Sequence, residues 1–569
     1  MPEIGDSIPA LIDFRAEHQA DDPAYTFVDY EADPAGVSES LSWSELRDRV
    51  YVVADTLARI GSPGDRVAIV APQGLEYVIG FFGAIQAGMI AVPLSVPQPG
   101  QHDARVASAL GDCAPVAVLT TSAVVDEVRK YAQTPSSQRP PKVIEVDALD
   151  FDSPVKPVAV QSYPKIAYLQ YTSGSTRAPA GVEITHRNAL VNVDQAVTEY
   201  FENLDRLPED LTIVCWAPLY HDMGLILGVF MPLGTGRPCV LLSPVAFMQK
   251  PLRWIQQMAA YPSVITAGPN FAFEVAARRC SDADLEGMDL SGVLVMINGG
   301  ERVQATTVRR FAERFGPHGL ADSAMRPTLG MAEAAVFVVT SAGGRPPTMA
   351  RFDPEKLAAG HAEVCAQGGT ELVTAGRPRT CELVVVDPET LVERPAGEVG
   401  ELWMRGEQVG SGYWRNPEAT EAAFNGRLAQ SPADRWLRTG DLAVMFADEV
   451  FIIGRLKDLL IVDGRNHYPD DIETTVTGIT GGRVAAVSVP DGITEKLIVI
   501  AEVKETDPQR LGDMKEKVTA AVSQEHGVRV GDAMFVAPRS LPITTSGKVR
   551  RKASLELYLA GQLSRLDAL

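Results

Sequence analysis

The sequence is poor in positive charge. Its 569 residues contain 52 Lys and Arg against 73 Asp and Glu, which gives a formal net charge of −21 at pH 7. Such an acidic chain is a poor electrostatic match for nucleic-acid phosphates, so no nucleic-acid partner is expected. The first residues, MPEIGDSIPALIDF, also lack the basic and apolar regions of a secretory signal peptide. We therefore expect no export signal at this end.

The sequence also lacks paired cysteines. Six are spread along the chain without a CxxC pair and without a histidine at zinc-binding spacing: Cys113, Cys215, Cys239, Cys280, Cys365 and Cys381. In a chain of this size such cysteines are typical of buried thiols rather than of a disulfide or metal framework. This usage predicts a reducing, cytoplasmic location.

Long hydrophobic runs are missing too. The longest uncharged stretch, residues 77–102, is interrupted by Gly80, Gly83, Gly88 and Pro93. It resembles a buried helix that leads into a strand more than a membrane span. No membrane-spanning segment is therefore expected.

What is present favours a large α/β protein. Hydrophobic residues make up 46% of the chain and charged residues 22%, which is enough to build several cores. β-Branched runs alternate with helical periodicity, the pattern of α/β folds. The clearest pairs are strand 67–70 with helix 75–87, strand 116–120 with helix 123–131, and strand 264–266 with helix 270–279; 213–216 and 240–242 are further strands.

Three parts are expected along the chain. Residues 1–380 have the α/β pattern, and 381–457 contain short strands with turn residues, typical of a small antiparallel β subdomain. Residues 458–569 then predict a compact α+β domain, with strands at 484–489 and 497–503 and a helix near 511–526. A loop-like segment at 341–374 is long for a connection inside a compact domain, so it is functional or mobile.

The most informative segment is YTSGSTRAPAGVEITH at residues 171–186. Small hydroxyl residues and Gly174 follow an apolar strand, and such a turn offers backbone N–H groups and hydroxyls to phosphate oxygens. It is not a Walker A loop, because no Lys-Ser/Thr pair follows at the required spacing. Taken alone, the segment is more typical of an ordinary turn than of a phosphate site.

This segment does not stand alone. It resembles the phosphate-binding loop of the acyl-adenylate-forming superfamily, which includes acyl-CoA synthetases, luciferases and peptide-synthetase adenylation domains. Six further segments resemble that superfamily's motifs in the right order: APLYHDMGL (217–225), NGGERV (298–303), RPTLGMAEA (326–334), LRTGDLA (437–443), IIGRLKDLLIVDGRNHYPDDIE (452–473) and PITTSGKVRR (542–551). The resemblance extends over nearly the whole chain.

Within the superfamily the chain is most similar to the fatty-acyl-AMP ligases of actinobacteria. The loop has Arg177 and Ala180 where CoA ligases have Gly and Lys, and the tail motif GRNHYPDDIE is that of this branch. Residues 341–374 stand where these ligases carry an insertion that is thought to hinder thioesterification to CoA. The resemblance implies two α/β subdomains and a β subdomain, followed by a mobile α+β C-terminal domain, and an enzyme that uses ATP and Mg²⁺.

The resemblance also implies catalytic roles. Adenylate formation brings a carboxylate and a phosphate together, so charge neutralisation and positioning dominate. Lys548 would bridge the two anions, and Glu333 would hold Mg²⁺ as a hard oxygen ligand. Asp441 would accept hydrogen bonds from both ribose hydroxyls, with Arg455 as a second nucleotide contact. His221 would border the substrate carboxylate, although a histidine between apolar segments is equally typical of a core.

The remaining nucleotide contacts are assigned by motif: Thr172, Ser173, Gly174, Ser175 and Thr176 to the phosphates, and Asn298, Gly299, Gly300, Glu301, Leu329, Gly330 and Met331 to the adenine slot. One of them departs from the superfamily, which usually has an aromatic residue at Leu329 to stack on adenine. By analogy with base–aromatic stacking, that loss costs about 1–3 kcal/mol.

Motion and partners follow from the same resemblance. Lys457 and Asp458 would form the hinge about which the C-terminal domain rotates between the two half-reactions. The expected substrate is a fatty acid, whose chain would be enclosed by the apolar segments 224–232 and 268–273. The expected acceptor is the thiol of an acyl carrier protein or of a polyketide synthase carrier domain. Basic residues at the tail would attract this acidic partner: Lys548, Arg550, Arg551 and Lys552.

Three alternatives remain open at this point. An acyl-CoA ligase is disfavoured by the insertion and by Ala180. A degenerate member that binds nucleotide or lipid without turnover is prompted by Leu329. The presence of four motif residues together argues against it: Glu333, Asp441, Arg455 and Lys548. An amino-acid adenylation domain would need an acidic residue for the amino group, and Asp222 is the only nearby candidate.

Overall fold

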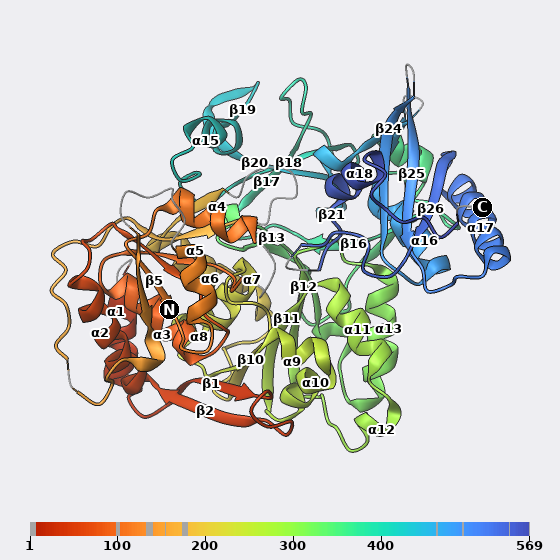
Figure 1. Ribbon diagram of the computed structural model, residues 1–569. Helices are drawn as coiled ribbons and strands as arrows, with labels where there is room; N and C mark the ends of the chain where they lie inside the picture. Colours follow the sequence, from red (N-terminus) through yellow and green to blue (C-terminus); the bar gives the residue numbers. More distant parts are fainter. Residues whose placement is uncertain are drawn as a thin grey trace.

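The computed structural model describes residues 7–97, 103–132, 140–153, 155–172, 180–462, 465–491, 494–544 and 547–567. Figure 1 shows the chain as several connected bodies, with the C-terminal elements in blue beside the yellow-green part. Within the described ranges, no helix is both long and apolar enough to cross a membrane.

The first body is built on a sheet of six strands, which in spatial order are β6 (Lys142–Glu145), β5 (Ala117–Thr120), β3 (Arg66–Ile69), β4 (Ile90–Pro93), β7 (Ile166–Tyr171) and β8 (Gly181–Thr185). All neighbours are parallel except β7 and β8, which form an antiparallel hairpin. This hairpin carries the predicted phosphate loop between its strands.

The second body is built on a sheet of eight strands: β14 (Phe337–Thr340), β13 (Met325–Gly330), β12 (Val293–Gly299), β11 (Ser263–Gly268), β9 (Leu211–Cys215), β10 (Cys239–Leu242), β1 (Pro23–Asp29) and β2 (Val37–Ser42). The strands from β13 to β1 run parallel, and an antiparallel strand closes each edge. Ligands of such sheets bind beyond the carboxyl ends of the parallel strands.

Helices surround both sheets: α1 (Ile8–His18), α2 (Trp43–Ala58), α3 (Leu75–Gln86), α4 (Ala104–Cys113), α5 (Val125–Ala132), α6 (His186–Tyr200), α7 (Asp222–Leu225), α8 (Met231–Thr235), α9 (Pro244–Gln249), α10 (Leu252–Ala259), α11 (Asn270–Arg279), α12 (Asp282–Leu285) and α13 (Ala305–Phe315). Helix α3 is buried along nearly its whole length, which explains its continuous apolar sequence. Helix α6 is preceded by Thr185, whose side chain accepts a hydrogen bond from the amide of Asn188 and so caps the helix.

The β subdomain is an antiparallel sheet in the order β15 (Met349–Phe352), β16 (Thr370–Gly376), β21 (Glu449–Arg455), β20 (Ser431–Phe446), β18 (Val399–Arg405) and β17 (Glu382–Val386), with β19 (Gly426–Leu428) beside β20 and helix α15 (Pro417–Phe424) nearby. Two of its strands precede residue 381, so the predicted boundary there is too late. The segment 341–374 is likewise not a plain loop, because it supplies β15, helix α14 (Pro354–Ala358) and part of β16.

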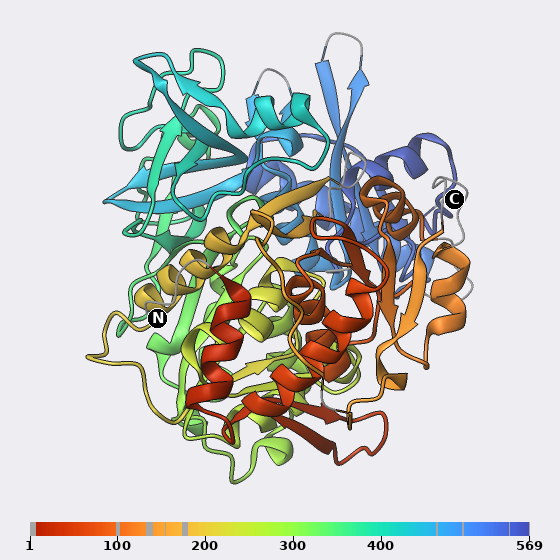
Figure 2. The same cartoon turned by 90° about the vertical axis from the view of Figure 1, so that its left-hand side faces the viewer.

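The C-terminal domain follows the short turn at Leu456–Asp458. It contains the hairpin β22 (Leu460–Val462) and β23 (Arg465–His467), the sheet β24 (Val484–Asp491), β25 (Thr494–Glu502) and β26 (Val530–Val536), and the helices α16 (Pro469–Thr480), α17 (Pro508–His526) and α18 (Arg551–Leu559). In Figure 2 this blue domain and the cyan β subdomain lie together above the rest of the molecule. The predicted α/β class, with a smaller α+β domain after the larger part, is confirmed.

Candidate active site

A cavity of about 1250 Å³ lies where the second sheet, the β7–β8 hairpin, the β subdomain and the C-terminal domain meet. Its wall includes the carboxyl ends of β12 and β13, the facing strands β20 and β21, and Lys548 of the C-terminal domain. Large concave sites of this kind at the ends of parallel strands are typical ligand sites.

Asp441 and Arg455 face each other across strands β20 and β21. They are directly paired in the strand register, and Asp441 Oδ1 lies 3.1 Å from Arg455 Nε. Burial raises the pKa of Asp441, while Arg455 and Lys548 oppose that rise; in turn, Asp441 raises the pKa of Arg455. Both side chains line the cavity, so a carboxylate acceptor and a guanidinium donor are presented side by side.

Glu333 lies in a short turn directly after β13. Its Oε1 accepts a hydrogen bond of 2.7 Å from the hydroxyl of Tyr413, and its backbone carbonyl accepts one from the amide of Gly410. Its charge also acts on Arg455, which places the carboxylate near the Asp441 pair. Tyr413 was not predicted as a site residue, and only the fold brings it to Glu333, since 80 residues separate them.

Lys548 reaches the cavity from the C-terminal domain. Its Nζ donates a hydrogen bond to the backbone carbonyl of Gly300. Burial lowers the pKa of Lys548, and Arg455 lowers it further, whereas Glu301, Asp222 and Asp441 act in the opposite direction. The ammonium group therefore stands among three carboxylates and one guanidinium, at the centre of the predicted site.

His221 precedes helix α7 and pairs with its neighbour. Its Nδ1 lies 2.5 Å from Oδ1 of Asp222. Burial alone raises the pKa of Asp222, but His221, the amide of Met223 and Lys548 together hold it below its ordinary value. Asp222 is thus a charged partner of His221 and Lys548, which makes it a poor candidate for binding a substrate amino group.

The two glycine motifs bring the backbone of β12 and β13 close together. A Cβ on Gly299 would stand 2.6 Å from the carbonyl oxygen of Thr328, so no larger residue fits there. Glu301 accepts a hydrogen bond of 2.7 Å from the amide of Phe271, and burial raises its pKa. The following residues of both motifs line the cavity: Gly299, Gly300, Glu301, Leu329, Gly330 and Met331.

Some predicted nucleotide contacts are not found in this cavity. Asn298 is fully buried in β12 and does not line the cavity, so its side chain cannot contact a ligand in this conformation. Thr172 does line the cavity, and its amide donates to the carbonyl of Ala180 at the base of the β7–β8 hairpin. The predicted phosphate contacts Ser173, Gly174, Ser175 and Thr176 lie outside the described residues.

Part of the cavity wall is apolar. Helix α6, the turn of π-helix at Ile226–Phe230 and strands β12 and β14 contribute this part, which includes Ala196, Tyr200, Leu227, Met231, Ile297 and Phe337. The predicted apolar segment 224–232 therefore contributes to the wall. The other predicted segment, 268–273, is absent from the lining.

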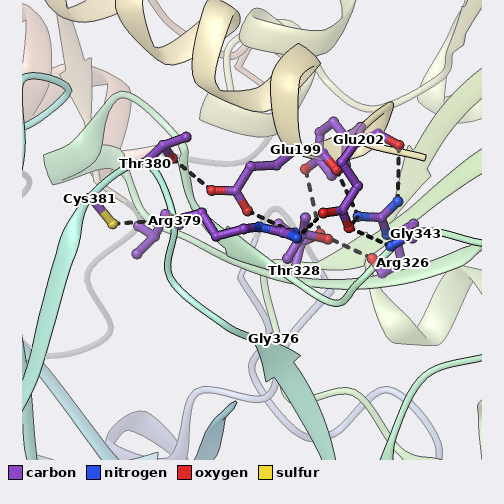
Figure 3. Close-up of polar contacts among 12 residues, drawn as sticks. Glu199, Glu202, Arg326, Thr328, Gly343, Gly376, Arg379, Thr380 and Cys381 are labelled. Carbon is purple, nitrogen blue, oxygen red and sulfur yellow. Dashed lines mark hydrogen bonds and ion pairs between the residues drawn. The ribbon is translucent and has the colours of Figure 1, made fainter. Parts of the chain in front are cut away.

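A network of ion pairs stands behind the apolar part (Figure 3). Arg326 of β13 donates to the carbonyls of Glu199 and Tyr200 at the end of α6, each at 3.0 Å. Arg379 pairs with the carboxylates of Glu199 and Glu202. Tyr200 lies between this network and the cavity, with its ring 5.3 Å from that of Phe337. The end of α6 is therefore held firmly against β13.

The predicted hinge lies at the cavity rim. Lys457 and Asp458 end the turn at Leu456–Asp458, and both line the cavity. Asp458 is 3.0 Å from Arg551, which also pairs with Asp470 and Glu473. Arg551 is thus committed to carboxylates inside the molecule, and its predicted place in a basic patch for a carrier partner is wrong.

The side chains of the cavity suit a magnesium ion only if substrate phosphates supply further ligands. Among the described residues, no three His, Cys, Asp or Glu side chains cluster in a way that would hold a metal ion. Mg²⁺ commonly takes one or two protein carboxylates and completes its shell with phosphate oxygens and water. Glu333, whose carboxylate faces the cavity beside the Asp441 pair, suits that limited role.

Comparison with known proteins decides the family. The sequence profile described as AMP-binding enzyme matches residues 12–414, and a second profile, for the AMP domain of Disco-interacting protein 2-like proteins, matches residues 457–567. The chain belongs to the AMP-binding enzyme family. The resemblance found in the sequence motifs is thereby confirmed.

Several AMP-binding enzymes are similar to this chain over nearly its full length. The long-chain-fatty-acid–AMP ligase FadD26 of Mycobacterium marinum is 51% identical over 100% of both chains. The long-chain-fatty-acid–AMP ligase FadD28 of Mycobacterium tuberculosis is 50% identical over 99% of both chains. The 4-hydroxyphenylalkanoate adenylyltransferase of Mycobacterium tuberculosis is 49% identical over 99% of this chain and 93% of its own.

Solved structures agree with this assignment. A structure from a study of fatty acyl-adenylate ligases from E. coli and L. pneumophila matches with a TM-score of 0.84 at 28% identity, over 98% of both chains. The fatty acyl-adenylate ligase from L. pneumophila in complex with acyl adenylate and pyrophosphate matches with a TM-score of 0.75 at 30% identity, over 99% of this chain and 98% of that one. The fold of the described residues is thus that of fatty acyl-adenylate ligases of known structure.

Proposed function

We propose that this protein activates a fatty acid with ATP and then passes the acyl group to the thiol of a carrier protein or polyketide synthase carrier domain. The observation that carries the proposal is the meeting of Lys548, Glu333 and the Asp441–Arg455 pair beside an apolar wall in one cavity. The names of the relatives, long-chain-fatty-acid–AMP ligases, support the same substrate class.

The first half-reaction is a displacement at phosphorus. An oxygen of the fatty carboxylate bonds to the α-phosphorus of ATP, the bond from that phosphorus to the bridging oxygen breaks, and pyrophosphate leaves. Lys548 neutralises the two approaching anions, and Glu333 would hold a Mg²⁺ ion, which would supply charge neutralisation for the phosphates. Asp441 accepts hydrogen bonds from the ribose hydroxyls, and Arg455 fixes its carboxylate.

The second half-reaction transfers the acyl group. The carrier thiol loses its proton, its sulfur bonds to the acyl carbonyl carbon, and the bond from that carbon to the AMP oxygen breaks. The C-terminal domain would rotate about Lys457 and Asp458 to admit the carrier's thiol. Lys548 belongs to the C-terminal domain, so it would leave the cavity when that domain rotates.

Contacts of the segment 341–374 support a preference for a carrier over CoA. Tyr468 of the C-terminal domain is buried among residues of this segment, including Phe352 and Leu357, and its hydroxyl donates to the carbonyl of Leu357 at 3.3 Å. This contact restrains the rotation that a small soluble thiol would require. A carrier protein can compensate with binding energy of its own interface.

The first test follows acyl-AMP by mass spectrometry with purified protein, Mg²⁺-ATP and saturated fatty acids from medium to very long chain. A 4-hydroxyphenyl alkanoic acid joins the series, because a relative at 49% identity is named for that substrate. CoA and a holo-carrier protein are added in parallel reactions. Acyl-AMP that persists with CoA and disappears with the carrier supports the proposal. Rapid acyl-CoA formation contradicts the carrier preference, and no adenylate with any acid refutes the proposal.

A further inference from the structure

One ion pair joins the C-terminal domain to the loop that follows strand β12. Arg302 Nη1 lies 2.5 Å from Asp471 Oδ1, and the two side chains are only 9% and 13% exposed. Arg302 is held on its own side of this contact by a hydrogen bond of 3.3 Å to the carbonyl of Ile453 in β21. It also directly follows Glu301 in the sequence. The C-terminal domain is thus fastened beside the residues that surround Lys548.

Ion pairs and hydrogen bonds link the region of Asp471 to that of Lys548 within the C-terminal domain. Arg551 pairs with Asp470 at 2.8 Å and with Glu473 at 2.6 Å, which ties the start of α18 to the first turn of α16. The turn before α18 is closed by two hydrogen bonds between Thr544 and Lys548, of 2.7 and 3.1 Å. Any shift of α16 relative to β12 therefore moves Lys548 relative to the carbonyl of Gly300.

Breaking this pair within its buried surroundings would be costly. Asp471 faces Asp470 and the half-buried His526 as well as Arg302, and burial and Asp470 both disfavour its charge. Without Arg302 the carboxylate would be left buried beside a second carboxylate, which is strongly unfavourable. The nearby contact between Tyr468 and Leu357 is a neutral hydrogen bond and gives less restraint.

We propose that Arg302 and Asp471 are positioning residues for adenylation: their ion pair holds the C-terminal domain where Lys548 reaches the reacting anions, and it breaks before acyl transfer. The inference rests on the proposed function, because it concerns the first of its two half-reactions. Neither residue needs to touch a substrate for this role.

The test measures the two half-reactions separately in the full-length protein. For Asp471→Asn we expect acyl-AMP formation at saturating ATP to slow about tenfold, since the pair is lost. Transfer to a holo-carrier from supplied acyl-AMP should stay within about twofold of wild type, because the pair is already broken in that step. Asp471→Glu keeps the charge and should recover most of the adenylation rate.

Asp567→Asn is the matched control. Asp567 is also a buried carboxylate in an ion pair, 2.7 Å from Lys515, but both partners lie within the C-terminal domain. We expect this variant to keep its adenylation rate even where its thermal stability falls. Adding Arg302→Gln to Asp471→Asn should slow adenylation no further, since both changes remove the same contact.

Several outcomes would overturn the inference. One is an adenylation rate in Asp471→Asn equal to that in Asp567→Asn. Another is an equal fall in the rates of adenylation and of acyl transfer in Asp471→Asn. A third is a double variant, Asp471→Asn with Arg302→Gln, in which the effects of the two changes on the adenylation rate add fully. Absence of acyl-AMP with the wild-type protein is a distinct result, because it refutes the proposed function itself. A normal wild-type rate with an unaffected Asp471→Asn variant refutes the ion-pair role alone.

Discussion

At the scale of single residues, the site depends on charges that compensate each other. Lys548 stands near Glu301, Asp222 and Asp441, and burial lowers its pKa in spite of them. Arg455 shares this surrounding and is stabilised as a cation mainly by Asp441. The site holds its cations near neighbouring carboxylates until anionic substrates provide further partners.

Removal of Lys548 should abolish most adenylation. In Lys548→Ala we expect the rate of acyl-AMP formation to fall at least about a hundredfold, since the ammonium group that reaches the Gly300 carbonyl from the C-terminal domain is lost. Pyrophosphate release measured at saturating ATP and fatty acid checks this. Lys504→Ala, at an exposed position of the same domain, should leave the rate unchanged.

His186 predicts a pH dependence of stability. It is buried at the start of α6, accepts a hydrogen bond from the amide of Ile8, and its pKa is lowered by burial from 6.5 to about 4. Between these values the unfolded chain binds the proton more readily than the folded chain, so stability falls as the pH decreases and is fully regained above 6.5.

We expect this contribution to be lost in His186→Gln. From about pH 7 to about pH 5, wild type should lose about 2 kcal/mol more unfolding free energy than the variant. Urea unfolding of both proteins at several pH values measures the difference. His18→Gln, which makes the same substitution at an exposed position of α1, serves as the control. Parallel curves for wild type and His186→Gln would contradict the expectation.

At the scale of elements, helix α6 shapes the apolar part of the cavity. Its last turns present Ala196 and Tyr200 to the cavity, and its end is held by Arg326 and by the carboxylates of the network in Figure 3. A side chain added on this face cannot be accommodated by a shift of the helix. The space available to an acyl chain is therefore fixed by the residues on α6.

Ala196→Phe should shift the preference of the enzyme towards shorter fatty acids. We expect the preferred chain length to decrease, with KM for the longest acids rising about tenfold or more because the added ring fills the apolar space. Adenylation rates over a series of chain lengths test this. Thr198→Phe lies on the exposed face of the same helix and should keep the wild-type preference. An unchanged preference in Ala196→Phe would mean that the acyl chain lies elsewhere.

At the scale of the whole molecule, the site is assembled from parts of the chain that lie far apart in the sequence. The second sheet supplies Glu301 and Glu333, the β subdomain supplies Asp441 and Arg455, and the C-terminal domain supplies Lys548. The segment 341–374 joins two of these parts, because it belongs to the β sheet and also encloses Tyr468. We therefore expect the segment 341–374 to influence the motion of the C-terminal domain rather than the chemical steps.

Shortening the segment 341–374 should allow the acyl group to be transferred to CoA. Phe352 and Thr370 are paired in the β15–β16 hairpin, so residues 353–369 can be replaced by a tight Asn-Gly turn without removing either strand. We expect acyl-CoA formation to rise about tenfold or more while acyl-AMP formation stays near wild type, since Tyr468 loses its partner Leu357. Tyr558→Phe, which removes a hydroxyl hydrogen bond to Asp532 within the C-terminal domain and leaves the Tyr468 contact intact, is the control. Unchanged acyl-CoA formation would contradict a restraining role.

The sequence by itself determined the family, the α/β class and most of the motif residues around the cavity. These features depend on short-range patterns: apolar periodicity, glycines at a close approach such as Gly299, and functional side chains at fixed positions within motifs. Lys548, Glu333, Asp441 and Arg455 were all assigned in this way, and the structure brings them to one cavity.

Only the tertiary structure decided how the parts join. The partnership of Tyr413 with Glu333, the burial of Arg551 among carboxylates, the entry of β15 and β16 into the β sheet and the pairing of Arg302 with Asp471 link residues far apart in the chain. No local pattern specifies such contacts, because each depends on the final packing of separate elements. The same reason explains why Asn298 lies in a motif yet is buried away from the cavity.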